Sequence, residues 1–307
     1  LETQFDYPVS PGEVRDAQYG FRNLVSILAS DRTLFNSSSH RRRFFREGEQ
    51  FLSRLPKPVP SQMLEKARRR SGVLYPGIEC PLEEDEPNAD SYAEPAHSDR
   101  TGGSSGRSTA PSEKNSGYRS EAPLILWNHR WEHDKGPETF FRALFALDKP
   151  DLHWKLAVAG EQYSKAPPVF AEARERLAGR ITHFGYCEDR EEYRELLRRA
   201  DIVVSTALQE NFGISVVEAI VAGALPLLPD RLSYPELLHR GSWKTLLYEG
   251  GRELREKLAD AIARPESYIQ AAAQARERLL RYCWREHAPR FDRLMERLIR
   301  GDADPSN

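Results

Sequence analysis

The second half of the chain alternates short apolar runs with amphipathic segments, and this alternation constrains the fold more than any other feature. The apolar runs lie at residues 124–127, 154–160, 181–185, 201–206, 225–228 and 246–249. Helical spacing of apolar residues marks the segments between them, at 137–147, 169–179, 190–200 and 214–223. Strands that are apolar on both faces and separated by helices indicate a parallel sheet covered on both sides. The sequence therefore predicts an α/β fold with right-handed connections, typical of Rossmann-like domains.

This domain is predicted to span residues 122–307 and to end in three helices, at 252–263, 266–282 and 287–300. The region before it is smaller. It shows helices at 15–30 and 42–55 and strands at 33–37 and 72–78. Because one or two parallel strands are unstable alone, residues 1–82 are interpreted as an incomplete Rossmann-like domain. Leu1 is not a methionine, and we expect the first strands of this domain to precede it.

A polar segment at 83–121 separates these two regions. Its net charge is −5, against +4 for residues 1–82 and −1 for residues 122–307. It has few aliphatic residues, so it cannot bury enough apolar area to offset its ordering entropy. We predict a disordered acidic linker between two domains, and the alternative is a surface insertion within one domain. A length of 307 residues leaves room for two domains.

Charge, hydropathy and cysteine spacing exclude several classes of protein. The net charge of −2 selects no partner by bulk electrostatics, and no run of about 18 apolar residues predicts a membrane span. A charged-then-apolar leader is also missing, so nothing in the sequence marks secretion. Cys80, Cys187 and Cys283 lie far apart and predict neither a zinc site nor a disulfide framework. That usage fits a reducing cytoplasm, which is the predicted location.

Open α/β sheets bind ligands beyond the carboxyl ends of their strands, so the loops after the strands are the candidate site. The loop after 124–127 reads Asn-His-Arg-Trp-Glu-His-Asp-Lys-Gly and carries two cations, Arg130 and Lys135. Such a pair suits a diphosphate, although a charged loop of this kind can also be merely solvated. His129 and His133 are four residues apart, but with no third ligand in view they do not predict a metal site.

The loop after 201–206 carries two acids, Glu210 and Glu218, with seven residues between them. Gly213 opens the following helix, so its backbone amides can approach an anion closely. Glu218 lies about one turn into a helix that is otherwise apolar, and a buried carboxylate needs a partner. This arrangement offers one carboxylate for sugar hydroxyls, a helix N-terminus for phosphate and a second carboxylate for a ribose.

The acidic pair with Phe212-Gly213, preceded by Arg130 and Lys135, resembles retaining nucleotide-sugar glycosyltransferases of family 4, which have the two-domain GT-B fold. Within that family the chain is most similar to the tRNA-queuosine alpha-mannosyltransferase group. The stretches that carry this similarity are 125–141, 200–220 and 232–238, with YPV at 7–9, RDAQYGF at 15–21 and FNS at 35–37. The resemblance covers most of 1–80 and 122–300 and leaves out the linker.

The resemblance implies a role for individual residues. Arg130 and Lys135 would hold the donor diphosphate, Glu210 would contact the transferred hexose, and Glu218 would bind the donor ribose. The remaining donor-binding residues that it implies are Gly160, Tyr186, Asn211, Phe212, Gly213 and Ile214, with Tyr186 in a turn beside the base. The donor would be GDP-mannose and the acceptor a hydroxyl of queuosine in tRNA. Such enzymes need no metal or other cofactor, because the cations and the helix dipole stabilise the leaving diphosphate.

The chain also departs from the family pattern. The family has a His-Glu-x-Gln stretch where this chain reads Leu1-Glu2-Thr3-Gln4, and the glycine-rich loop that opens the first domain is missing. Two other functions therefore stay open. One is a family 4 glycosyltransferase that acts on a glycan or a small molecule. The other is a truncated, inactive module that binds a nucleotide sugar.

A tRNA acceptor needs a cationic surface. Residues 39–70 carry ten Lys and Arg against three Glu, a net charge of +7. We therefore predict that this basic segment contacts the tRNA backbone, and the alternative is an ordinary solvated helix face. The arginines concerned include Arg41, Arg42, Arg43, Arg46, Arg68, Arg69 and Arg70.

Overall fold

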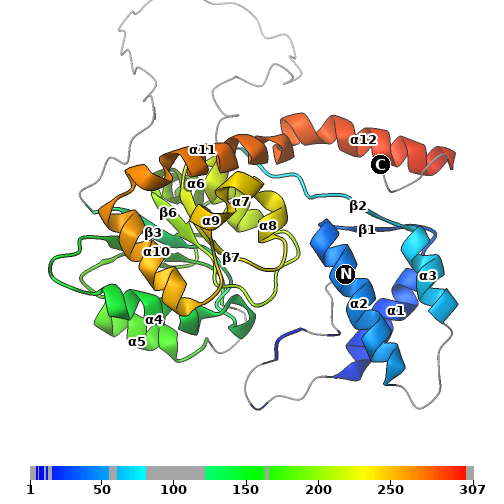
Figure 1. The fold of residues 1–307 in the computed structure, drawn as a ribbon, viewed down its shortest axis with the longest axis horizontal. Coiled ribbons are helices and arrows are strands. Elements are labelled where there is room, and N and C mark those ends of the chain that lie inside the picture. Colours follow the sequence, from blue (N-terminus) through cyan, green and yellow to red (C-terminus); the bar gives the residue numbers. More distant parts are fainter. Residues whose placement is uncertain are drawn as a thin grey trace, which may run out of the picture.

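The computed structural model describes residues 5, 7–9, 12, 16–54, 61–80, 122–162 and 166–301. These form a small N-terminal lobe (residues 16–80) and a larger C-terminal domain (residues 122–283), followed by a long helix (Figure 1). The predicted linker at 83–121 and the stretch Leu1–Gln4 lie outside the described residues. The division of the chain into domains at residues 82 and 122 stays a prediction.

The C-terminal domain is built on a six-stranded parallel sheet with the order β5-β4-β3-β6-β7-β8. Its strands are β3 (Leu124–Trp127), β4 (Lys155–Ala159), β5 (Ile181–Gly185), β6 (Ile202–Val204), β7 (Leu225–Pro229) and β8 (Leu247–Tyr248). Each strand coincides with one of the six apolar runs. The chain first builds outward from β3 to β5 and then returns to place β6 on the other side of β3. The order of the strands therefore reverses between β3 and β6.

Helices cover both faces of this sheet (Figure 1). They are α4 (Pro137–Leu147), α5 (Val169–Arg176), α6 (Arg190–Arg199), α7 (Ile214–Val221), α8 (Tyr234–Leu237), α9 (Trp243–Leu246), α10 (Gly251–Ala263) and α11 (Glu266–Leu279), with short 3-10 turns η1 (His133–Lys135), η2 (Arg240–Ser242) and η3 (Leu280–Tyr282). Helix α4 packs against α5 and α10, whereas α7 packs against α6 and α11. This is the doubly wound arrangement that the alternating pattern predicts.

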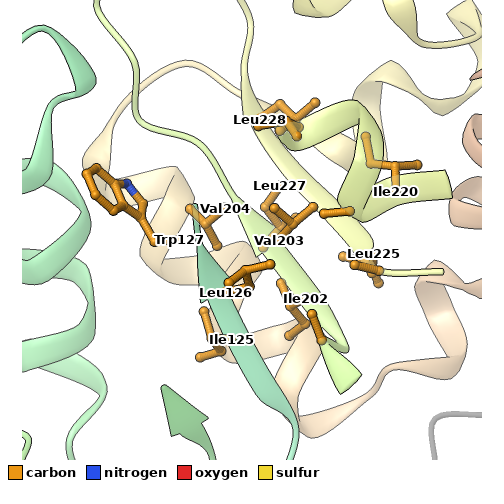
Figure 2. Close-up of a cluster of buried hydrophobic side chains, with 14 of the residues drawn as sticks. Ile125, Leu126, Trp127, Ile202, Val203, Val204, Ile220, Leu225, Leu227 and Leu228 are labelled. Atoms are coloured by element: carbon orange, nitrogen blue, oxygen red, sulfur yellow. The ribbon is translucent and has the colours of Figure 1, made fainter. Parts of the chain in front are cut away.

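The core of the domain lies on both sides of the central strands β3, β6 and β7. The side chains of Ile125, Leu126, Val203 and Leu227 are fully buried there, together with Ile220 from α7 (Figure 2). Apolar residues at successive positions of one strand point to opposite faces, so a strand that is apolar throughout can only be buried on both. The carboxyl ends of these rigid strands set the positions of the loops that follow them.

The N-terminal lobe has its own aromatic core. It consists of α1 (Ala17–Ala29), β1 (Thr33–Phe35), α2 (Ser38–Ser53), α3 (Ser61–Arg69) and β2 (Ser71–Val73). The two strands pair in parallel, and the helices enclose Phe35, Phe44 and Phe45. The two helices predicted here are confirmed, while α3 was not predicted. Helix α2 begins after Ser37, which is its N-terminal cap. The Ser37 hydroxyl accepts a hydrogen bond from the backbone amide of His40 at 3.0 Å.

The last helix, α12 (Trp284–Arg300), leaves the C-terminal domain beside the segment that connects to the N-terminal lobe. The Ile78 amide donates to the Tyr282 carbonyl at 2.8 Å, and the Trp284 amide donates to the Ile78 carbonyl at 3.0 Å. Figure 1 shows α12 extending toward the side of the N-terminal lobe. Among the described residues, no helix is both long and apolar enough to cross a membrane.

The same contact brings Cys80 and Cys283 together in a disulfide, with 5.5 Å between their Cα atoms. The prediction that the cysteines form no disulfide was therefore wrong. The two residues are 203 positions apart, and they meet only because the chain pairs at Ile78 and Cys283. Spacing along the sequence carries no information about a contact of this kind. Cys187 is the remaining cysteine, and its thiol is free and buried.

Candidate active site

A pocket of about 480 Å³ opens at the carboxyl ends of β3 and β6, where the order of the strands reverses. This is the position at which open α/β sheets bind ligands. Its walls are formed by Asn36, Asn128, His129, Arg130, Lys135, Glu210, Asn211, Phe212, Gly213, Ile214, Ser215 and Glu218. Eight of the ten predicted site residues are in this list, and Gly160 and Tyr186 are not. Asn36 belongs to the N-terminal lobe, so both parts of the protein contribute to the pocket.

A second cavity of about 460 Å³ lies at the opposite, amino end of the strands, beside Ala122, Lys155 and Arg180. Arg180 is already engaged there, because its guanidinium donates to Asp148 Oδ1 and to the carbonyls of Lys149 and Leu152. The pocket at the carboxyl ends is therefore the candidate active site.

Lys135 is the buried cation of the pocket, with 8% of its surface exposed. Its Nζ lies 3.1 Å from Asp134 Oδ2 and 3.5 Å from Glu210 Oε2, and it donates to the Gln209 carbonyl at 2.9 Å. The turn η1 and the left-handed Gly136 that follows it (φ 63°) place the side chain here. A Cβ atom on Gly136 would lie 2.4 Å from the Thr206 carbonyl oxygen, so the close approach of this loop to β6 requires glycine.

Arg130 is the second cation, and its side chain is 39% exposed. Its guanidinium lies 3.2 Å from Glu132 and 3.9 Å from Asp134, which hold it at the edge of the pocket. An arginine in this position can donate several hydrogen bonds to a phosphate while Lys135 supplies a point charge behind it. The two predicted cations are thus brought to one pocket.

The orientation of the Glu210 carboxylate is fixed by hydrogen bonds within its own loop. Its Oε1 accepts hydrogen bonds from the amides of Asn211 at 3.0 Å and Phe212 at 3.3 Å. Gly213 follows as the cap of α7 with φ 98°, a conformation that favours glycine. The first residues of α7 line the pocket, and the amides of a first helical turn have no partner within the helix. They are therefore suited to an anion.

Glu218 also lines the pocket. It has a hydrogen-bond partner, as expected for a buried carboxylate on an otherwise apolar helix. The Tyr193 hydroxyl donates to Glu218 Oε2 at 3.3 Å, and the Asn128 amide donates to the Tyr193 hydroxyl at 3.1 Å. Burial raises the pKa of the Glu218 carboxyl. The contribution of Tyr193 was not predicted. The signal available was its place beside Leu196 and Leu197 on the apolar stripe of α6.

Two residues of the pocket wall each bury a polar atom that lacks a partner. Within the described part of the chain, Asn128 Oδ1 and His129 Nε2 have no hydrogen-bond partner. Burial, together with the charges of Lys135 and Arg130, lowers the pKa of His129 to about 3, so its imidazole is neutral at pH 7. A buried polar atom without a partner is costly.

The possible metal ligands of the described residues gather elsewhere. His183, Cys187 and Glu192 are the one group of three whose ligand atoms come within 4.8 Å of one another in this part of the chain. Burial and the nearby Glu192 raise the pKa of the Cys187 thiol to about 11, which disfavours the thiolate that a metal would need. Neither His129 nor His133 belongs to this group. That the site works without a metal stays a prediction.

Gly160 and Tyr186 lie outside the pocket wall. A Cβ atom on Gly160 would lie 1.9 Å from the His129 carbonyl oxygen, so this glycine allows the ends of β3 and β4 to approach each other. Gly160 thus contacts the backbone of His129, which lines the pocket. Tyr186 is 60% exposed in the turn after β5. Its predicted place beside a nucleotide base stays a prediction.

Both the N-terminal lobe and the C-terminal domain are similar to known proteins. Residues 1–78 match the family model described as tRNA-queuosine alpha-mannosyltransferase N-terminal, and residues 109–278 match that of the glycosyl transferases group 1. The tRNA-queuosine alpha-mannosyltransferase of Drosophila melanogaster is 31% identical over 267 residues, which are 87% of this chain and 64% of that protein. A GDP-mannose:cellobiosyl-diphosphopolyprenol alpha-mannosyltransferase of Xanthomonas oryzae is 31% identical over 121 residues, 38% of this chain and 32% of that protein. The chain thus spans less than two thirds of either curated relative.

Solved structures agree on the fold. Sucrose-phosphate synthase from Thermosynechococcus elongatus superposes with a TM-score of 0.66 at 17% identity, over 98% of this chain and 67% of that one. The Anabaena protein HepE, in complex with UDP and glucose, gives a TM-score of 0.61 at 15% identity, over 92% and 67%. Likeness at this level of identity shows the fold alone. The predicted α/β fold of the GT-B type is confirmed.

The match to the second family model covers more than half of the chain, and it includes every strand of the six-stranded sheet and both loops that carry the cations and the acids. The chain belongs to the glycosyl transferases group 1 family.

Proposed function

We propose that the chain binds GDP-mannose in this pocket and transfers mannose, with retention of configuration, to the queuosine nucleoside of tRNA. The observation that carries the proposal is the grouping of two cations, a helix N-terminus and Glu218 in one pocket at the reversal point of the sheet. The choice of sugar and acceptor is supported by the printed name of the Drosophila relative and by the family match over residues 1–78.

The chemistry proposed for the pocket follows from its charges. Transfer breaks the bond between the sugar C1 and the phosphate oxygen, and negative charge builds up on the departing diphosphate. In this proposal Lys135, Arg130 and the first amides of α7, which line the pocket, stabilise that charge without a metal. The acceptor oxygen forms its bond to C1 on the same face, and its proton passes to the departing phosphate. Glu210 contacts the hexose in this scheme, and Glu218 accepts hydrogen bonds from the ribose.

The donor assignment is tested by titration calorimetry with GDP-mannose, using UDP-glucose as the competing donor. We expect selective binding of GDP-mannose, and we expect Glu218→Ala to weaken it by about 10- to 100-fold, since hydrogen bonds to a carboxylate are lost. Glu277→Ala, which removes an exposed carboxylate on α11, serves as the matched control and should bind as the unmodified chain does. Equal affinity for both donors, or an unaffected Glu218→Ala variant, would contradict the assignment.

The basic segment at 39–70 is the candidate surface for tRNA, but only some of its cations are exposed. Arg41 donates to Ser71 Oγ and to the Arg68 carbonyl, and Arg43 donates to Gln209. Both side chains make hydrogen bonds within the protein, so replacing them would disturb the structure as well as any contact with tRNA. Arg46, Lys66 and Arg69 are exposed. Arg46 pairs with Glu47 and Arg69 with Glu65 at the surface, where such pairs are weak. These three cations are the residues proposed to meet the phosphates.

Reversing Arg46, Lys66 and Arg69 together to glutamate is expected to weaken tRNA binding. The logarithm of the binding constant should also depend less steeply on the logarithm of the salt concentration, by about three in slope. The matched control reverses Arg142, Arg252 and Arg255, exposed on α4 and α10, and makes the same change in net charge. An identical salt slope in both triple variants would remove this surface from the proposal. Retained GDP-mannose binding without any tRNA binding would favour a glycan or lipid-linked acceptor.

The predicted cytoplasmic location also remains a proposal. The spacing of the cysteines does not support it, because Cys80 and Cys283 form a disulfide. A tRNA acceptor is what supports it now.

A further inference from the structure

A carboxylate of the C-terminal domain binds the beginning of a helix in the N-terminal lobe. Glu236, on the short helix α8, accepts hydrogen bonds from the amides of Ser38 and Ser39, one to each oxygen and both at 2.8 Å. These are the first two residues of α2, whose amides have no partner within the helix. The helix dipole adds attraction for a negative charge at this end. The lobe therefore presents an anion site that a side chain of the other domain fills.

Two further groups of the N-terminal lobe surround the same carboxylate. The Tyr75 hydroxyl donates to Glu236 Oε1, and the Arg42 guanidinium lies 4.0 Å from Oε2. The Glu236 side chain is only 16% exposed. Burial and the hydrogen bond to Glu236 raise the pKa of Tyr75 to about 12, so its hydroxyl keeps its proton at neutral pH. Among the described residues, the four partners of the Glu236 carboxylate all belong to the N-terminal lobe.

The same end of α2 also holds the loop that carries Glu210. The Ser37 hydroxyl donates to the Asn211 carbonyl at 2.6 Å, and Arg43 donates to the side chain of Gln209. The Gln209 carbonyl in turn accepts the hydrogen bond from Lys135. Residues on both sides of Glu210 are therefore held by α2, and one of them also holds the buried cation of the pocket.

Helix α8 closes this set of contacts from the other side. The Ser233 hydroxyl, just before α8, donates to the Phe212 carbonyl at 2.9 Å. The loop 209–212 consequently lies between α2 and α8, and the carboxylate of Glu236 joins those two helices. Ser37 and Glu236 belong to the stretches FNS (35–37) and LSYPELL (232–238), which carry part of the family resemblance.

We propose that Glu236 is a positioning residue that fixes the N-terminal lobe against loop 209–212 and so keeps Glu210 and Lys135 in place. The contact itself is independent of the reaction that the pocket carries out. Its effect on sugar transfer rests on the proposed function.

Hydrogen exchange measures the contact directly, because the Ser38 and Ser39 amides depend on Glu236 for protection. In Glu236→Ala we expect exchange at the start of α2 to be about tenfold faster or more, with a smaller increase in loop 209–212. Glu236→Gln keeps one acceptor oxygen and should fall between Glu236→Ala and the unmodified chain. Glu49→Gln is the matched control, because it neutralises an exposed carboxylate of α2 that pairs within the lobe. Unchanged exchange at Ser38 and Ser39 would overturn the proposal.

The effect on the pocket is measured by separating kcat from the affinity for GDP-mannose. Glu236→Ala should lower kcat about tenfold or more while strands β3 and β6 keep their slow exchange, which shows that the domain stays folded. Faster exchange with an unchanged kcat would overturn the positioning role. If the unmodified chain transfers no sugar, the proposed function fails, and exchange in loop 209–212 still decides whether Glu236 positions it.

Discussion

Replacing Lys135 with methionine is expected to lower kcat/KM for sugar transfer by about 100- to 1,000-fold, the cost of removing a preorganised charge from a site of this kind. Methionine keeps the apolar stem of the side chain and removes only the ammonium. Asp134, 3% exposed, and Glu210 then lose their shared counter-charge, so the variant should also unfold at a lower denaturant concentration. Breaking a buried ion pair from one side costs about 3–5 kcal/mol. Steady-state kinetics and denaturant unfolding measure the two effects.

Lys149→Met is the control, because Lys149 is exposed in the turn that follows α4 and its loss should change neither quantity. A Lys135→Met variant with normal transfer would show that the diphosphate is not held where we place it. A variant that is stable but inactive would separate the two roles of the ammonium.

Replacing Gly160 with alanine is expected to lower the free energy of unfolding by about 3 kcal/mol, near the upper end for overpacking. The new Cβ atom would lie 1.9 Å from the His129 carbonyl oxygen, and both atoms are tied to rigid strand ends. We expect relief of this overlap to move the loop that carries Asn128, His129 and Arg130. The affinity for the proposed donor, GDP-mannose, should therefore fall together with stability, although no atom of Gly160 lines the pocket.

Gly179→Ala provides the comparison. A Cβ atom on Gly179 would have no neighbour within 4 Å, so the free energy of unfolding should change by less than about 1 kcal/mol. Equal stability of the two alanine variants, measured by denaturant unfolding, would mean that the strand ends yield easily and that Gly160 has no structural role.

Much of the C-terminal domain could be predicted because its strands are apolar throughout and its helices are long enough to show their period. All six strands and the helices from α4 to α7 occur where the pattern placed them. Helices α8 and α9 have four residues each, too few for any periodicity to appear. Helix α3 is strongly charged and follows prolines at 56, 58 and 60, so its short apolar face gave no clear helical pattern.

The pocket was predictable to the extent that it lies in two loops at the reversal point of the sheet. Arg130, Lys135, Glu210 and Glu218 meet there because parallel strands present their carboxyl ends at one edge. The partners of these residues could not be predicted in the same way. Tyr193 reaches Glu218 from another helix, and Glu236 contacts Ser38 across 198 residues. Such contacts depend on how the helices and the two lobes pack, and a local pattern does not encode that packing.

The Cys80–Cys283 disulfide changes the covalent topology of the chain. It closes residues 80–283 into a ring that contains the whole C-terminal domain, while the N-terminal lobe and α12 become two tails that leave the ring at one point. A single protease cut between residues 81 and 121 would open the ring without releasing either piece, because one piece carries Cys80 and the other Cys283. In a denaturing gel the nicked protein would migrate as one species until a thiol reductant separates the two pieces.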